Sequence, residues 1–163
     1  MRHAIPLMAL LVASSLAPDS IAGCKHARPP SCAAFDPLFQ AQGKAHHIPW
    51  RLLRALAWRE SKCAPCVVSH AGARGVMQII PTTFAALGPF AEVDDPFDPA
   101  HSIAAGAYYL GALLSWYGGD VRKALAAYNT GPGRVDAGRI PSATDAYVDD
   151  ILEHFHHLGG TFR

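Results

Sequence analysis

Residues 49–61 read PWRLLRALAWRES and predict the helix on which the interpretation of this chain depends. Pro49 suits the first turn of a helix, because the N–H group that it lacks would have no partner there. Three apolar residues precede Glu60 by seven, four and three positions, so they share its face of the helix. The arginines of the stretch lie mostly around the other side. The sequence therefore predicts an amphipathic helix with a carboxyl group at the end of its apolar stripe.

That position would perturb the Glu60 carboxyl group. Burial beside leucines and the negative end of the helix macrodipole both disfavour its charged form and raise its pKa. A raised pKa is what a general acid at neutral pH requires. The alternative is a Glu that simply extends from the last turn into solvent, and this helix alone favours that plainer interpretation.

The rest of the chain is also predicted to be helical. From Phe35 onward there is no sustained period-2 alternation and no hairpin turn signal. Residues 103–118 carry no formal charge, but 16 residues with three glycines fit a buried central helix better than a membrane span. The sequence predicts an all-α, single-domain fold, with a loop at residues 90–99 and a chain break at Gly131-Pro132-Gly133. The expected helices cover residues 36–43, 49–61, 81–88, 101–118, 120–129 (capped by Asp120) and 142–158.

Composition excludes several functional classes. The chain has 163 residues, of which 50% are hydrophobic, with 14 Lys and Arg against 13 Asp and Glu and a net charge of +1. That balance argues against nucleic-acid binding by bulk charge, an acidic disordered tail and a polybasic membrane-surface protein. The length suits one domain with a substantial core, and we expect a monomer that binds no nucleic acid.

Residues 1–23 are predicted to be a signal peptide. A short positive start precedes an uncharged apolar run of 13 residues, from Ala4 to Leu16, and small residues follow. This length suits a secretory segment and is too short to span a bilayer. The sequence thus predicts an exported, periplasmic protein of residues 24–163, against the alternative of a buried N-terminal helix.

The four cysteines fit an oxidising compartment. Cys24, Cys32, Cys63 and Cys66 form an even set compatible with two disulfides. Residues 21–24 also resemble a lipobox in which Cys24 would be acylated. Acylation would leave one thiol unpaired, so ordinary cleavage is favoured. Three pairings are open, and we favour bridges that join the 24/32 segment to the 63/66 segment.

Four segments, in order, resemble the lytic transglycosylase family. The first ends in a Glu-Ser pair at Glu60. The second is similar to that family's Gly-Leu-Met-Gln segment, with Val76 for Leu, and the third to its Ala-Tyr-Asn-Ala-Gly segment, with Thr130 for Ala. The fourth segment contains Tyr147. The four segments are residues 52–61, 69–78, 126–133 and 140–148, and the motif core as a whole spans residues 52–152.

The resemblance implies a lysozyme-like fold and cleavage of peptidoglycan. The β-1,4 bond between N-acetylmuramic acid and N-acetylglucosamine would break with formation of a 1,6-anhydro-muramic acid end. Glycosidases normally use two carboxyl groups, whereas here Glu60 alone would act as acid and then as base. Asp94, Asp95 and Asp120 are the other candidate carboxylates, better explained as turn residues and a helix cap.

The resemblance also implies a set of substrate-binding side chains. Gln78 and Asn129 would hydrogen-bond the glycan, and Tyr147 would orient Glu60 or the sugar. Met77 would form the pocket floor, although it and the other tyrosine of the set also suit a plain core. The full set is Ser61, Met77, Gln78, Tyr128, Asn129 and Tyr147.

We expect neither a metal nor a cofactor. The chain has nine histidines, dense at residues 46–47 and 154–157. A solvated helix end, where protonated His complements the helix dipole, explains the second group better than a metal site.

Two alternatives to a lytic transglycosylase stay open. One is a hydrolytic muramidase on the same fold, which would need a second carboxylate or a held water. The other is a non-catalytic peptidoglycan-binding component of a secretion or pilus system. The short single-domain layout suggests such a protein partner by analogy only.

Overall fold

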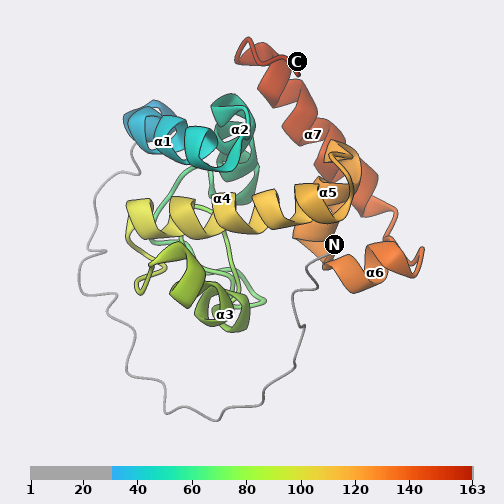
Figure 1. The fold of residues 1–163 in the computed structure, drawn as a ribbon, viewed down its shortest axis with the longest axis horizontal. Helices are drawn as coiled ribbons and strands as arrows, with labels where there is room; N and C mark the ends of the chain where they lie inside the picture. Colours follow the sequence, from blue (N-terminus) through green and yellow to red (C-terminus); the bar gives the residue numbers. More distant parts are fainter. Residues whose placement is uncertain (1–30, 163) are drawn as a thin grey trace.

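The computed structural model describes residues 31–162, and the predicted signal peptide and Cys24 lie outside this range. The described chain is all-α, as predicted, with two isolated β-bridges and no strand among these residues (Figure 1). The elements are η2 (Cys32–Phe35), α1 (Asp36–His46), α2 (Trp50–Ser61), α3 (Pro81–Ala91), α4 (Pro99–Trp116), α5 (Val121–Thr130), α6 (Pro132–Asp136) and α7 (Ala143–His157).

Helix α4 is the centre of the fold. It contacts α1, α2, α3 and α5, and it crosses the molecule between them (Figure 1). Ile103, Ala107 and Leu110 on its inner face are fully buried in the core. The prediction of a buried central helix is confirmed, and no helix of the described part is long and apolar enough to cross a membrane.

Two predicted helix ends were wrong because a glycine was taken as a stop. Helix α1 continues past Gly43 to His46, since Gly43 packs closely: a Cβ there would lie 2.7 Å from the Ile48 carbonyl oxygen. Helix α3 continues past Gly88 and through Pro89. It ends when Glu92 adopts a left-handed conformation and donates its N–H to the Gly88 carbonyl.

Two other boundaries also differ from the prediction. Helix α4 begins at Pro99, because Asp98 caps it by accepting from two backbone N–H groups. The chain break lies at Gly131 alone, whose φ is 84°, and the short helix α6 begins at Pro132. Proline suits a first helical position, so the predicted break is followed directly by a helix.

The predicted link between the two cysteine segments is confirmed for one bridge. Cys32 and Cys63 form a disulfide that ties η2 to the chain just beyond α2. Cys66 is disulfide-bonded as well. The fully buried Cys63 follows Lys62, and both have left-handed backbones that end α2.

Candidate active site

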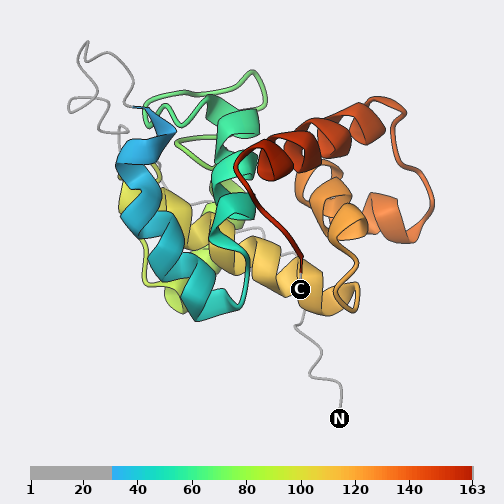
Figure 2. The same cartoon turned by 90° about the horizontal axis from the view of Figure 1, so that it is seen from above.

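Helix α7 packs against α2 (Figure 2), and Tyr147 of α7 contacts Glu60 near the C-terminal end of α2. The phenol of Tyr147 donates a hydrogen bond to Oε1 of Glu60. Tyr147 is only 4% exposed, and Glu60 is half-buried. The predicted contact between these residues, which are 87 positions apart, is thus present.

The environment of Glu60 favours its protonated form. Burial raises the pKa of its carboxyl group from the ordinary 4.5 to about 6. The Tyr147 hydrogen bond and the nearby Arg59 charge oppose that rise, since both stabilise the carboxylate. The carboxyl group can therefore exchange a proton near neutral pH, which suits a group that gives a proton and then takes one back.

Tyr147 remains a proton donor throughout this range. Burial, followed by the Glu60 charge, raises its pKa well above 10. The Arg59 guanidinium lies 5.1 Å from the centre of its ring, and Arg59 Nε donates to Oδ2 of Asp150 at 3.1 Å. Arg59 was predicted to lie mostly away from Glu60, yet it covers the tyrosine that Glu60 contacts.

A backbone turn before α3 is held by side chains of three helices. Ser61 Oγ donates to the Val76 carbonyl oxygen at 2.7 Å. The Met77 N–H donates to Ser102 Oγ at 3.1 Å, and the Tyr128 phenol donates to the Met77 carbonyl oxygen at 2.9 Å. These bonds come from α2, α4 and α5, so the turn has a fixed place beside the end of α2.

Close packing explains the glycine of this turn. Gly75 has a φ of 73°, and a Cβ there would lie 1.9 Å from the Pro96 carbonyl oxygen. Only glycine fits this approach, which seats the turn against the loop before α4.

The predicted substrate-binding residues differ in how far they are free to meet a ligand. Met77 is fully buried, and the Ser61 hydroxyl is used within the fold. The Gln78 amide nitrogen donates to two backbone carbonyls, at 3.0 and 2.9 Å, while its amide oxygen remains an acceptor. Asn129 is exposed on the last turn of α5. Burial, followed by the Glu60 charge, raises the pKa of the Tyr128 phenol, so Tyr128 lies within electrostatic reach of Glu60.

Two residues of this site were missed from the sequence. Ser102 holds the Met77 backbone although it lies on the buried face of α4. A polar residue on the apolar face of a helix was the available signal. Gly106, one turn further, would place a Cβ 2.7 Å from Met77 side-chain atoms and is needed for that contact.

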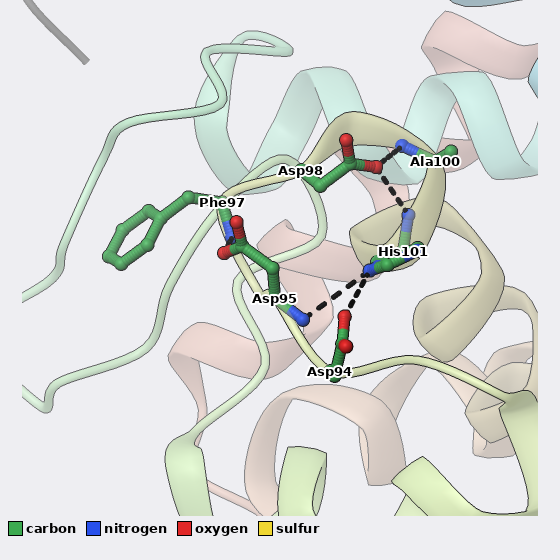
Figure 3. A network of polar contacts seen from close by, with 6 residues as sticks. All are labelled: Asp94, Asp95, Phe97, Asp98, Ala100 and His101. Atoms are coloured by element: carbon green, nitrogen blue, oxygen red, sulfur yellow. Dashed lines mark hydrogen bonds and ion pairs between the residues drawn. The ribbon is translucent and has the colours of Figure 1, made fainter. Parts of the chain in front are cut away.

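The alternative carboxylates occupy structural positions. Asp120 caps α5, and Asp95 accepts from the Phe97 N–H at 2.9 Å. Asp94 Oδ1 lies 3.0 Å from Nδ1 of His101 (Figure 3). For Asp95 and Asp120 these are the turn and cap roles that the sequence favoured, whereas Asp94 contacts a histidine side chain. Within residues 31–162, no three or more His, Cys, Asp or Glu side chains are grouped so that they could hold a metal ion.

Comparisons with known proteins identify the family of this chain. Residues 37–145 match the family model described as the transglycosylase SLT domain. The chain is 35% identical over 118 residues to membrane-bound lytic murein transglycosylase F of Pseudomonas fluorescens (strain Pf0-1), covering 69% of this chain and 24% of that protein. It is 38% identical over 122 residues to the peptidoglycan transglycosylase of Escherichia phage T7, covering 73% of this chain and 9% of that protein.

Solved structures extend the likeness to the fold. The 70-kDa soluble lytic transglycosylase from Escherichia coli matches with a TM-score of 0.67 at 31% identity, over 77% of this chain and 25% of that one. The chain spans about a quarter or less of the length of these relatives. The family match covers most of the described residues and includes both Glu60 and the turn beside it. The chain belongs to the transglycosylase SLT domain family.

Proposed function

We propose that this protein is a peptidoglycan lytic transglycosylase in which Glu60 is the sole catalytic carboxyl group. The observation that carries the proposal is the Glu60–Tyr147 contact, in which a half-buried carboxyl group with a pKa of about 6 accepts from a phenol. The Glu60 pKa is shifted by burial, by the Tyr147 hydrogen bond and by the Arg59 charge. No second carboxylate is among these influences.

The geometry supports a two-step proton cycle. Protonated Glu60 donates its proton to the glycosidic oxygen as the bond to C1 of N-acetylmuramic acid breaks. The resulting carboxylate then takes the proton of the C6 hydroxyl of the same sugar, whose oxygen attacks C1. The products are a 1,6-anhydro-muramic acid end and a free hydroxyl on N-acetylglucosamine, and Glu60 regains its proton. No water is consumed.

Tyr147 has a specific part in this cycle. Its hydrogen bond stabilises the carboxylate formed after the first step and thus limits the rise in the Glu60 pKa. It also fixes one oxygen of Glu60, which leaves Oε2 to face the sugar. Gln78, Tyr128 and Asn129 would line the surrounding cleft above the buried Met77, with the Gln78 amide oxygen and the exposed Asn129 offered to the glycan.

We also infer that the protein acts outside the cytoplasm as residues 24–163. The signal-like segment of residues 1–23, the Cys32–Cys63 disulfide and the membrane-bound relative support this inference. Ordinary cleavage before Cys24, rather than its acylation, is retained as part of the proposal. Mass spectrometry of the protein from a bacterial host would give the mature N-terminus and show any lipid on Cys24.

The decisive experiment is to incubate the purified protein with peptidoglycan and determine the masses of the released fragments. Fragments ending in anhydro-muramic acid are one water lighter than those with reducing ends. Glu60→Gln should lower turnover by about 10²–10⁴-fold or more while glycan binding persists, since a general acid contributes roughly that much. The matched control is Glu92→Gln, an exposed glutamate at the end of α3, which should keep full activity. Reducing ends would establish the hydrolytic alternative, and binding without release would establish the non-catalytic one.

A further inference from the structure

A hollow lies between α2 and α7, and its α2 residues Trp58 and Lys62 lie on the opposite face of that helix from Glu60. Its volume is about 340 Å³, within the range of about 300–1,000 Å³ typical of small-ligand sites. We call it the α2–α7 groove. It is lined from α2 by Trp58, Arg59 and Lys62 and from α7 by Asp150, His154 and His157, with Glu153 also on its α7 wall.

The floor of the groove is an aromatic stack with a cation upon it. The rings of Trp58 and His154 are stacked with their centres 4.3 Å apart. The Lys62 ammonium lies 3.1 Å from the centre of the Trp58 ring. An indole face attracts a cation, but it does not neutralise it as a carboxylate would.

The cations of the groove disfavour one another's charge. Burial and then the Arg59 charge lower the pKa of Lys62, which Asp150 only partly offsets. Burial and then the charges of Arg54, Lys62 and His157 lower the pKa of His154. Arg59 already pairs with Asp150, and the Lys62 ammonium forms no ion pair with a carboxylate among the described residues. A carboxylate bound there would relieve this repulsion and accept charge-assisted hydrogen bonds.

The geometry points to this groove as a binding site for a carboxylate of the peptide stem carried by the peptidoglycan strand. Lys62 would hold the carboxylate beside the Trp58 ring, whose faces are already covered by Lys62 and by His154. Asp150 and Glu153 suit a ligand that also carries an amino group, and they disfavour a polyanion. The inference rests on the proposed function, since it takes peptidoglycan as the substrate.

The groove is within reach of the reacting sugar. Arg59 lines it and also lies over the ring of Tyr147, whose phenol contacts Glu60. Lys62 follows Glu60 by two residues at the end of the same helix. An extended peptide spans about 3.3–3.6 Å per residue, so four stem residues cover roughly 13–14 Å from the sugar. That length is comparable to the width of a helix with its side chains, which is about 10–12 Å.

The test compares two substrates and two matched variants. Lys62→Met keeps an apolar chain over Trp58 and removes the positive charge. Lys44→Met removes the charge of an exposed lysine on α1 and is the matched control. Substrates are intact glycan strands and strands freed of peptides by an amidase. Lys62→Met should raise KM about tenfold or more on peptide-bearing strands, as loss of a hydrogen bond to a charged group implies. KM on peptide-free strands should not change, and Lys44→Met should match the unchanged protein on both. An equal KM on peptide-bearing strands, or an equal loss on both substrates, would overturn the inference.

A binding measurement keeps this test separate from the proposed function. The free stem tetrapeptide is titrated into the protein while the Trp58 indole N–H is followed by NMR. A saturable shift is expected that Lys62→Met abolishes and that a peptide with amidated carboxyl groups does not produce. No shift, or the same shift with the amidated peptide, refutes the groove as a carboxylate site. Absence of turnover on both substrates would instead refute the proposed function, and the titration would still decide the groove.

Discussion

Replacing Glu60 by Gln should stabilise the protein at neutral pH. The pKa of Glu60 is about 6 in the folded protein against an ordinary 4.5, because burial disfavours its charge. Between these values the folded state binds more protons than the unfolded state, so the free energy of unfolding falls as the pH rises. The contribution of Glu60 to the free energy of unfolding is therefore most favourable below about pH 4.5, and it declines until about pH 6 to 7.

The size of the effect follows from the two pKa values. Their difference, at about 1.4 kcal/mol per pKa unit, amounts to about 2 kcal/mol. Gln is uncharged at every pH, so the variant lacks this loss. The stability of Glu60→Gln relative to the unchanged protein should rise by about 2 kcal/mol between pH 4 and pH 7.

Urea unfolding at several pH values, followed by far-UV circular dichroism, measures this difference without any substrate. Glu92→Gln serves as the control, because Glu92 is exposed and its replacement should give a difference that does not vary with pH in this way. The pKa itself can be read from the carboxyl carbon signals, because the chain has three glutamates. A pH-independent difference for Glu60→Gln, or a Glu60 carboxyl that titrates at 4.5, would refute the argument that burial prepares this group to act as an acid.

Two further predictions concern the residues around Glu60. Tyr147→Phe removes a hydrogen bond that stabilises the Glu60 carboxylate, and such bonds contribute about 1.5–3 kcal/mol. The alkaline limb of the pH profile of kcat/KM should therefore move up by about 1–2 pH units, while kcat falls. A limb that stays near pH 6 in rate measurements from pH 4 to 9 would contradict this. Gly106→Ala should destabilise the fold and lower kcat, since its Cβ would lie 2.7 Å from Met77 atoms and overpacking costs about 1–3 kcal/mol, more than the roughly 1 kcal/mol gained in helix propensity. Gly111→Ala on the same helix is its matched control, because its Cβ would be 3.6 Å from the nearest atom, so urea unfolding should show it as stable as the unchanged protein or up to about 1 kcal/mol more stable.

The sequence predicted those features of the fold that depend on local patterns. The apolar spacing around Glu60 and the uncharged stretch of α4 gave the correct helices and the correct buried faces. Asp120 was correctly placed as a cap, because capping is decided within three residues. The errors in the predicted helix ends arose at glycines that are present because of tertiary packing. Gly43 lies inside α1 because the following chain passes close to it, and a local pattern contains no such information.

The residues of the candidate site also fall into those that the sequence predicted and those that depend on tertiary packing. Glu60 was found from its own helix together with a resemblance, and Tyr147 only from the resemblance, since 87 residues separate the two. The role of Ser102 depends on a bond to the Met77 backbone, which a side-chain pattern does not predict. The position of Arg59 over Tyr147 depends on how α7 crosses α2, so helical periodicity alone assigned it to the wrong surroundings.

The Cys32–Cys63 bridge couples the stability of the domain around Glu60 to the chemistry of the surroundings in which the chain matures. It closes a loop with a sequence separation of 31, and restricting the unfolded chain in this way contributes about 3–4 kcal/mol, a large share of the 5–15 kcal/mol typical of a domain. Its second half-cystine lies three residues beyond Glu60, where α2 ends. A chain kept reduced would thus lack the anchor nearest to its acid group. Oxidation would complete the domain and the surroundings of Glu60 in one event, so that under the proposed function the site would become competent where thiols are oxidised.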